Sequence, residues 1–180
     1  MRQKEIGAAA QIWGAPERVA LVSSVDASGQ GNLIAVGWAM RANMDPPVYA
    51  IGLGHKSLSC ANIQVSGEFV FGIPGADLAT QVLYCGTHTG RDGDKFAATG
   101  LTPATAARVK APLVAECLVN LECRVIATQE IGDHSIFFGE VCQAWESDRD
   151  ESRLLAVIGK DSGYERFDGN EIFNLGTIGQ

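Results

Sequence analysis

The chain has 180 residues, of which 46% are hydrophobic and 19% are charged, a composition typical of one globular domain with a sizeable core. Its net charge of −7 leaves no basic stripe for nucleic-acid phosphates or an anionic membrane surface, so we expect neither partner. No apolar run is long enough to span a bilayer, and the charged start MRQKEIGAAAQIWG lacks the features of a signal peptide. We therefore expect a single domain over residues 1–180 in the cytoplasm.

Apolar runs separated by turn signals open the chain. Residues 19–26 are β-branched and apolar, and they end at a turn from Asp26 to Gly29. The apolar pattern resumes over 32–40, so the two runs predict a hairpin of two strands. The sequence Asp45-Pro-Pro47 interrupts the chain, and a third strand is expected over 48–53.

Short helices are predicted in the next part of the chain. A helix is predicted from Ser57 to about Val65, closed by Gly67, followed by a strand over 68–73. Asp77 is expected to cap a short helix that ends at Tyr84. The stretch CGTHTGRDGDK, residues 85–95, has three glycines and no periodicity, which predicts a loop. The length of this loop suggests that it has a function.

The second half of the chain is again rich in strand signals. A short helix around Phe96 is expected to end at Gly100, and residues 101–112 form a connector. Beyond it the expected elements are a long or bent strand over 114–128, a turn at Asp133-His134, a strand over 135–145, and a last strand and turn within 154–163.

Six or more strands joined by short turns predict a mainly β protein, an antiparallel barrel with flanking helices. The regular alternation of strand and helix that builds a parallel sheet is missing. No G-x-G-x-x-G opens a helix after a strand, and no G-x-x-x-x-G-K-[ST] occurs, so Rossmann and P-loop sites are not expected.

The five cysteines are isolated from one another, without a C-x-x-C pair. We therefore expect buried thiols in a reducing compartment, and neither a disulfide framework nor a zinc or iron–sulfur site.

Three stretches carry candidate ligand-binding groups. In HKSLSCANI, residues 55–63, Ser57 either simply caps a helix or joins Lys56 and Ser59 around an anion at the helix N-terminus. The loop over 85–95 either is a solvated surface loop or closes over a ligand through its glycines and its donors. In NLIAVGWAM, Gly37-Trp38 is either a core tryptophan beside a bend or a place where an aromatic ring approaches the backbone.

No side-chain pattern predicts catalysis by the protein itself. There is no G-x-S-x-G, no nucleophile beside an evident base, and no pair of carboxylates typical of glycosidases. His134, at a turn, is more typical of a structural histidine than of a catalyst. No catalytic side chain or metal ligand is therefore predicted, and the chemistry is expected to belong to a bound cofactor.

Four segments in order resemble one known family. Residues 19–54, YCGTHTGRDGDKF, APLVAECLVNLEC and GDHSIFFGEV are similar to segments of the flavin reductase-like proteins, and within them of the flavoredoxin type. The resemblance implies an FMN-binding split barrel of Greek-key type and a homodimer with one FMN per subunit.

The resemblance also implies the residues that hold FMN. Asn32 and the backbone from Val36 through Gly37, Trp38 and Ala39 to Met40 would line the isoalloxazine. The helix start with Ser57, Leu58, Ser59 and Asn62 would hold the phosphate, and Lys95 would add a cation. The loop with Cys85, Gly86, Thr87 and Arg91 would close over the cofactor, His134 would donate a hydrogen bond to it, and Phe167 would pack nearby.

Three functions remain open at this point. The first is an FMN-dependent oxidoreductase that reduces flavin or ferric complexes with electrons from NAD(P)H. The second is an electron-transfer protein that exchanges electrons with ferredoxin-like partners. The third is a non-enzymatic FMN-binding module.

Overall fold

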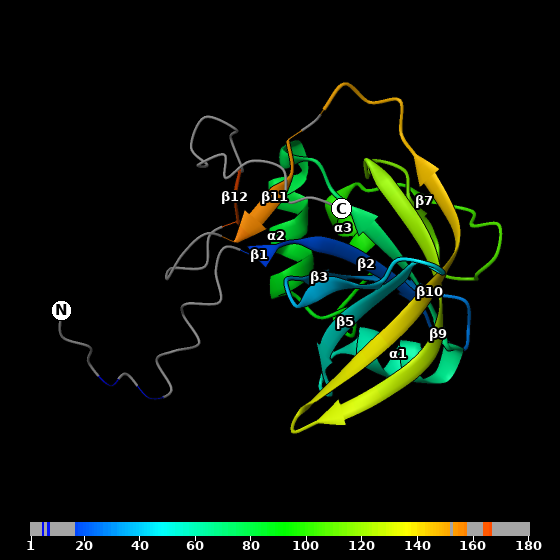
Figure 1. The fold of residues 1–180 in the computed structure, drawn as a ribbon. Helices are drawn as coiled ribbons and strands as arrows, with labels where there is room; N and C mark the ends of the chain where they lie inside the picture. Colours follow the sequence, from blue (N-terminus) through cyan, green and yellow to red (C-terminus); the bar gives the residue numbers. More distant parts are fainter. Residues whose placement is uncertain (1–4, 6, 8–16, 152, 158–163, 167–180) are drawn as a thin grey trace.

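The structure is a computed structural model that describes residues 5, 7, 17–151, 153–157 and 164–166. A seven-stranded antiparallel sheet dominates it (Figure 1). Across the sheet, the order is β3 (Gly31–Val36), β2 (Ala20–Val25), β6 (Glu68–Ile73), β9 (Val119–Ile131), β10 (His134–Glu146), β5 (Val48–Gly54) and β4 (Ala39–Asn43). The predicted mainly β architecture is therefore confirmed.

The sheet closes at Gly37 and Trp38. These two residues alone separate β3 from β4, although β3 and β4 form opposite edges of the sheet. The three Cα–Cα steps from the end of β3 to the start of β4 span at most about 10 Å, so the edges must lie next to each other and the sheet curls into a barrel. The backbone N–H of Gly52 on β5 donates to the carbonyl of Trp38 at 2.8 Å. The prediction of one strand over 32–40 is wrong, because the chain changes its pairing partner from β2 to β5 at this point.

The long strands β9 and β10 form a hairpin that extends beyond the barrel (Figure 1). Its turn contains Gly132, whose φ of 60° favours glycine. The expected strand over 114–128 is divided, because residues 115–118 separate the short β8 (Leu113–Val114) from β9. Strand β8 pairs with β7 (Pro103–Ala104) inside the expected connector.

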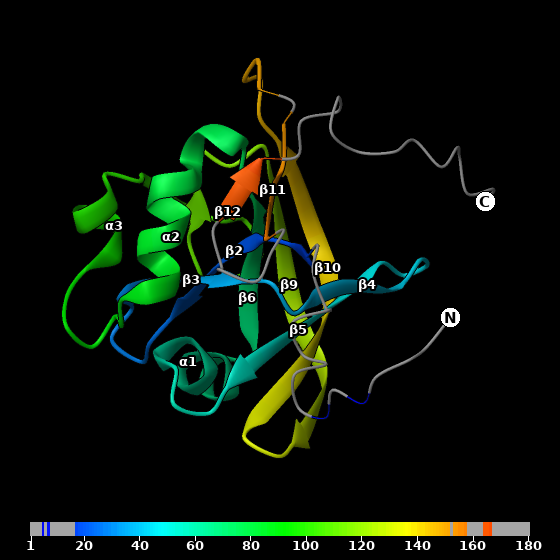
Figure 2. The ribbon, with the colours of Figure 1, turned by 90° about the vertical axis from the view of Figure 1, so that its left-hand side faces the viewer.

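Three helices gather on the side of the barrel near β2 and β3 (Figure 2). Helix α1 (Leu58–Ser66) begins after Ser57 and ends at Gly67, whose φ is 68°, as predicted. Helix α2 (Ala79–Thr87) follows a short 3₁₀ turn, η2 (Ala76–Leu78), and α3 spans Lys95–Thr99. The loop expected from Cys85 is therefore shorter, because Cys85 to Thr87 form the last turn of α2.

Alternation along β2 divides the core into two main parts. Ala20 and Val22 pack with Phe69, Phe71 and Phe137 and with side chains of α1. Leu21 faces the other way and, with Val19 just before the strand, joins the core beneath α2 and α3. All five cysteines are free thiols; Cys60 is buried, as predicted, and Cys142 is half-buried.

A buried carboxylate fixes the connector to the sheet. Glu122 on β9 is fully buried and accepts hydrogen bonds from the backbone N–H groups of Ala107, Arg108 and Val109 and from the indole N–H of Trp145. Burial alone would raise the pKa of this carboxyl, but these bonds together lower it.

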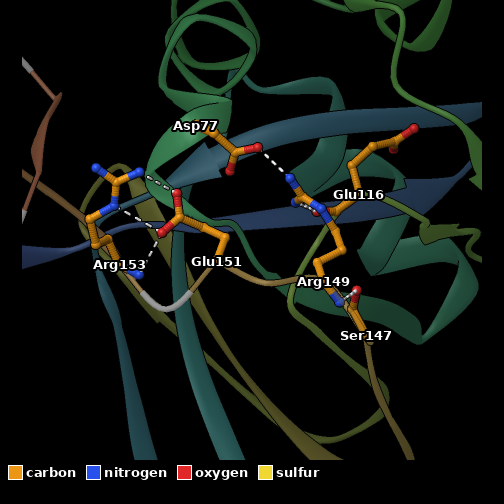
Figure 3. A network of polar contacts seen from close by, with 6 residues as sticks. All are labelled: Asp77, Glu116, Ser147, Arg149, Glu151 and Arg153. Atoms are coloured by element: carbon orange, nitrogen blue, oxygen red, sulfur yellow. Dashed lines mark hydrogen bonds and ion pairs between the residues drawn. The ribbon is translucent and has the colours of Figure 1, made fainter.

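A polar network holds the chain after β10 (Figure 3). Arg149 donates to the carboxylate of Asp77 and to the main-chain carbonyl of Glu116. The predicted cap at Asp77 is wrong: Gly75 precedes η2 without a side-chain cap, and the Asp77 carboxylate is used by Arg149 instead. Nearby, Arg153 and Glu151 form an ion pair at 2.8 Å.

The network leads into a small second sheet. It has the order β1 (Glu17–Arg18), β11 (Leu155–Val157) and β12 (Tyr164–Arg166). Strand β11 lies within the expected last strand, and β12 begins beyond it. Among the described residues, no helix is long and apolar enough to cross a membrane.

Candidate cofactor site

A cavity of about 300 Å³ lies where β3, the start of α1, the end of α2 and the start of α3 meet. We call it the polar pocket. Its wall consists of Asn32 and Ile34 from β3, residues 56–59, residues 85–90 and Lys95. Eight of the residues predicted to hold FMN are thus brought together: Asn32, Ser57, Leu58, Ser59, Cys85, Gly86, Thr87 and Lys95.

The start of α1 supplies hydrogen-bond donors to this pocket. The hydroxyl of Ser57 accepts from the backbone N–H of Cys60 at 3.1 Å, so the cap predicted from the sequence exists. In the described chain, the backbone N–H groups of Leu58 and Ser59 have no acceptor, as expected in the first turn of a helix. The helix dipole adds a positive potential there, so the cap and the anion-binding geometry occur together.

Asn32 presents an unpartnered oxygen at the pocket. The side chain is only 5% exposed, and its Nδ2 donates to the hydroxyl of Ser59 at 2.8 Å. Its Oδ1 is buried and has no hydrogen-bond partner among the described residues. An unpaired buried acceptor costs about 1–3 kcal/mol, so Oδ1 favours a ligand that carries a hydroxyl or N–H group.

Lys95 adds a cation. It begins α3 and is 4% exposed, and its Nζ donates to the carbonyls of Leu33 and Cys85, both at 2.8 Å. Burial lowers the pKa of Lys95 and raises the pKa of the Cys85 thiol to about 11, so Cys85 is a neutral wall residue. An ammonium has three hydrogens, which leaves one for a ligand.

The loop over residues 88–94 closes the pocket. At Gly90 an added Cβ would overlap Oδ1 of Asn32 and lie 3.0 Å from Cδ2 of Leu58, so only glycine fits without a shift. Arg91 does not line the pocket; its Nη1 donates to the main-chain carbonyl of Lys56 at 2.8 Å.

A second cavity, of about 460 Å³, surrounds Trp38. Gly37, Trp38, Ala39 and Met40 line it together with apolar residues of β5 and β10, and Glu17 and Arg18 lie at its edge. Trp38 and Met40 are each 60% exposed, so Trp38 is not the core residue that one interpretation of the sequence favoured. The side chain of Val36 is buried in the barrel core.

Other predicted residues lie apart from the polar pocket. Asn62 donates to the hydroxyl of Ser24 at 3.3 Å. Nδ1 of His134 donates to the carboxylate of Asp133 at 2.7 Å, and the ring centre of His134 lies 4.6 Å from that of Trp38; the hydrogen bond of His134 to FMN stays a prediction. Phe167 lies outside the described residues.

The FMN-binding set implied by the resemblance omitted Ile34, Lys56, His88, Thr89 and Gly90, which line the polar pocket. Lys56 and the loop over 85–95 are candidate binding elements from the residues alone, whereas Ile34 is not. Alternation along β3 places Ile34 on the same face as Asn32, and this signal could have identified it. His88 stacks on Tyr84, with ring centres 3.9 Å apart.

The donors of the polar pocket fit a phosphorylated ligand that also carries hydroxyl groups. A phosphate could accept hydrogen bonds from two free backbone N–H groups, from the hydroxyls of Ser57 and Ser59 and from the ammonium of Lys95. A ligand hydroxyl could donate to Oδ1 of Asn32. Such a set occurs in FMN, whose ribityl phosphate combines both groups.

The chain belongs to the family described as "Flavin reductase like domain", whose model matches residues 14–165. A protein of Archaeoglobus fulgidus is 32% identical over 128 residues, 71% of each chain. A flavin reductase of Pseudomonas putida is 27% identical over 150 residues, which cover 83% of this chain and 84% of the relative.

Solved structures share the whole fold. The flavoredoxin of Desulfovibrio vulgaris (Miyazaki F) is 26% identical, with a TM-score of 0.82 over 93% of this chain and 94% of that one. The flavoredoxin of Methanosarcina acetivorans is 25% identical, with a TM-score of 0.83 over 93% and 92%. The fold is thus the split barrel that the sequence resemblance implied.

Proposed function

We propose that the protein binds FMN and is an oxidoreductase that reduces free flavin or ferric complexes with electrons from NADH or NADPH. The observation that carries this proposal is the polar pocket, where a free helix N-terminus, a buried ammonium and an orphaned amide oxygen converge. Bound FMN would supply the redox-active isoalloxazine, while the protein supplies binding and orientation.

Different residues of the polar pocket would bind different parts of FMN. Ser57, Ser59 and the first amides of α1 would bind the phosphate, with Lys95 compensating its charge. Asn32 would accept from a ribityl hydroxyl through Oδ1. Strand β3 continues from Asn32 to its end at Val36, so a ligand that extends along it would bring its ring toward the backbone of residues 36–40.

Two measurements test this proposal. The purified protein, mixed with FMN and desalted, is expected to keep the visible absorption of bound flavin. Anaerobic mixing with NADH or NADPH should then bleach that absorption within seconds, and added ferric complex or free flavin should restore it. A protein that does not retain FMN, or a bound flavin that neither nucleotide reduces, would contradict the proposal.

The second candidate is an electron-transfer protein that exchanges electrons with a ferredoxin-like partner. The likeness to two flavoredoxins over the whole fold favours it, and the net charge of −7 is compatible with docking on a basic protein surface. Bleaching by reduced ferredoxin but not by NADH or NADPH would support this candidate. FMN bound but inert toward all three donors would indicate the third function, a non-enzymatic binding module.

We further propose a homodimer. Five large apolar side chains are exposed on β4, on the residues directly before and after it, and on β9: Trp38, Met40, Met44, Ile126 and Ile131. A second copy that covers them would remove this apolar area from water. In light scattering, Met40→Lys should shift the mass toward that of one chain, while Val65→Lys, at an exposed apolar residue of α1, should not.

Single-domain organisation and a cytoplasmic location belong to the same proposal. The family model spans residues 14–165, and the five free thiols are typical of a reducing compartment. Cooperative unfolding in one transition and recovery in the cytosolic fraction are the expected results.

A further inference from the structure

The loop over residues 88–94 has one hydrogen bond to a distant part of the described chain. Its other bonds are local: His88 with the end of α2, Thr89 with Arg91 and Asp92, and Asp94 with the start of α3. The exception joins Nη1 of Arg91 to the carbonyl of Lys56, 35 residues away, at 2.8 Å. This single bond ties the loop to the turn that precedes α1.

The position of that bond matters for access to the polar pocket. Lys56 directly precedes Ser57, which caps α1 and lines the pocket. Gly90, the neighbour of Arg91 in the loop, rests against Asn32 and Leu58, so closely that a Cβ would not fit. The loop therefore reaches both the start of α1 and β3, and the exposed side chain of Arg91 is not part of the pocket wall.

The closed loop leaves a polar group unsatisfied. Oδ1 of Asn32, buried beside Gly90, has no partner among the described residues. The free-energy cost of this unpaired oxygen opposes closure of the loop in the free protein. The hydrogen bond of Arg91 offsets part of that cost.

We infer that Arg91 is a positioning residue: it latches the 88–94 loop over the polar pocket through the carbonyl of Lys56 and does not contact the ligand. This inference rests on the proposed function, because it takes FMN as the ligand of the pocket. It differs from the expectation drawn from the family resemblance, in which Arg91 holds FMN directly.

The two roles predict opposite kinetics. A latch stabilises the closed loop in the free and the loaded protein alike, so its loss speeds both entry and exit of the ligand and leaves Kd nearly unchanged. A guanidinium that contacts the phosphate instead attracts the ligand and holds it. Its loss would slow entry, speed exit and raise Kd, and it would do so for FMN but not for riboflavin, which has no phosphate.

Stopped-flow flavin fluorescence separates these outcomes. With Arg91→Met, the association and dissociation rate constants should both rise, roughly fivefold to tenfold for one exposed charge-assisted bond. The rise should be equal for FMN and riboflavin, with Kd within about twofold. Arg108→Met, which removes an exposed charge outside the pocket, should leave all rates unchanged. Slower association with a higher Kd for FMN alone, or rates equal to those of the wild type, would overturn the inference.

A second measurement does not depend on any ligand. In the ligand-free protein, a protease that cleaves before aspartate should cut at Asp92 several-fold faster in Arg91→Met than in the wild type, because the released loop enters a protease cleft more readily. Arg91→Lys should restore part of the protection. Equal cleavage rates would refute the latch even if FMN does not bind, whereas faster cleavage without FMN binding would retain the latch and refute only the proposed function.

Discussion

Gly90→Ala tests the shape of the polar pocket with one methyl group. The new Cβ would overlap Oδ1 of Asn32 and lie 2.8 Å from its Cγ and 3.0 Å from Cδ2 of Leu58. Asn32 cannot retreat easily, since it is buried and bonded to Ser59. To bring Oδ1, the nearest atom, out to the 3.4 Å at which ordinary contact begins, the loop and β3 must separate by roughly 1.4 Å.

The loop is the part that should move, because one long-range hydrogen bond holds it. Global stability should then change by less than about 1 kcal/mol. The displaced wall should lose one or two hydrogen bonds to the ligand, which weakens FMN binding by roughly fivefold to thirtyfold. Fluorescence titration with FMN and thermal unfolding measure the two effects.

Gly93→Ala is the matched control in the same loop. No heavy atom lies within 4 Å of a Cβ built there, and neither glycine has a positive φ, so the pair differs only in available space. If Gly90→Ala binds FMN as tightly as the wild type, or if Gly93→Ala weakens binding equally, the packing of the loop against Asn32 does not shape the site.

Three further predictions follow from the buried polar groups and thiols. Lys95→Met should raise Kd for FMN by roughly tenfold to a hundredfold, with a much smaller change for riboflavin, because the charge-assisted bond to the phosphate is lost; equal losses for both ligands would place the lysine away from the phosphate. Glu122→Gln should lower the free energy of unfolding by about 2–4 kcal/mol at pH 7 in denaturant titrations, whereas the exposed Glu130→Gln should have almost no effect. Because the pKa of Glu122 is lowered in the folded protein, its contribution is complete above the unfolded pKa of about 4.3 and disappears as pH falls through the folded value; a difference that stays constant down to pH 3 would contradict this. Burial raises the pKa of Cys85 to about 11 and that of Cys117 to about 12, so iodoacetamide at pH 8 should alkylate the half-buried Cys142 first, and rapid labelling of Cys85 or Cys117 in the native protein would argue against their burial.

Local signals predicted local structure well. The turn after Asp26, the cap at Ser57 and the left-handed Gly67 depend on neighbouring residues, and all three occur as expected. The phosphate-binding interpretation of HKSLSCANI rests on the same local geometry, and the structure brings Asn32 and Lys95, also in the predicted set, beside it.

Features that depend on distant partners escaped prediction. The run over 32–40 is apolar throughout, and only the pairing of residues 39–43 with β5 shows that it is two strands. Asp77 is a residue type that often caps helices, but its carboxylate accepts a hydrogen bond from Arg149, 72 residues away. Gly86 suggested a loop, yet helix α2 continues to Thr87. Cys85 is buried in the core there, and its carbonyl accepts a hydrogen bond from Nζ of Lys95. Arg91 was predicted to hold the ligand, and nothing in the sequence indicates that its guanidinium donates to the carbonyl of Lys56, 35 residues away.

Paired titrations of the ligand-free protein with FMN and riboflavin test the central claim most directly. If the start of α1, Ser59 and Lys95 bind the phosphate, FMN should bind with a stoichiometry of one per chain and at least tenfold more tightly than riboflavin. Ser59→Ala should reduce the difference in affinity between FMN and riboflavin. Equal affinity for the two flavins, or no binding of FMN, would contradict the assignment of the polar pocket.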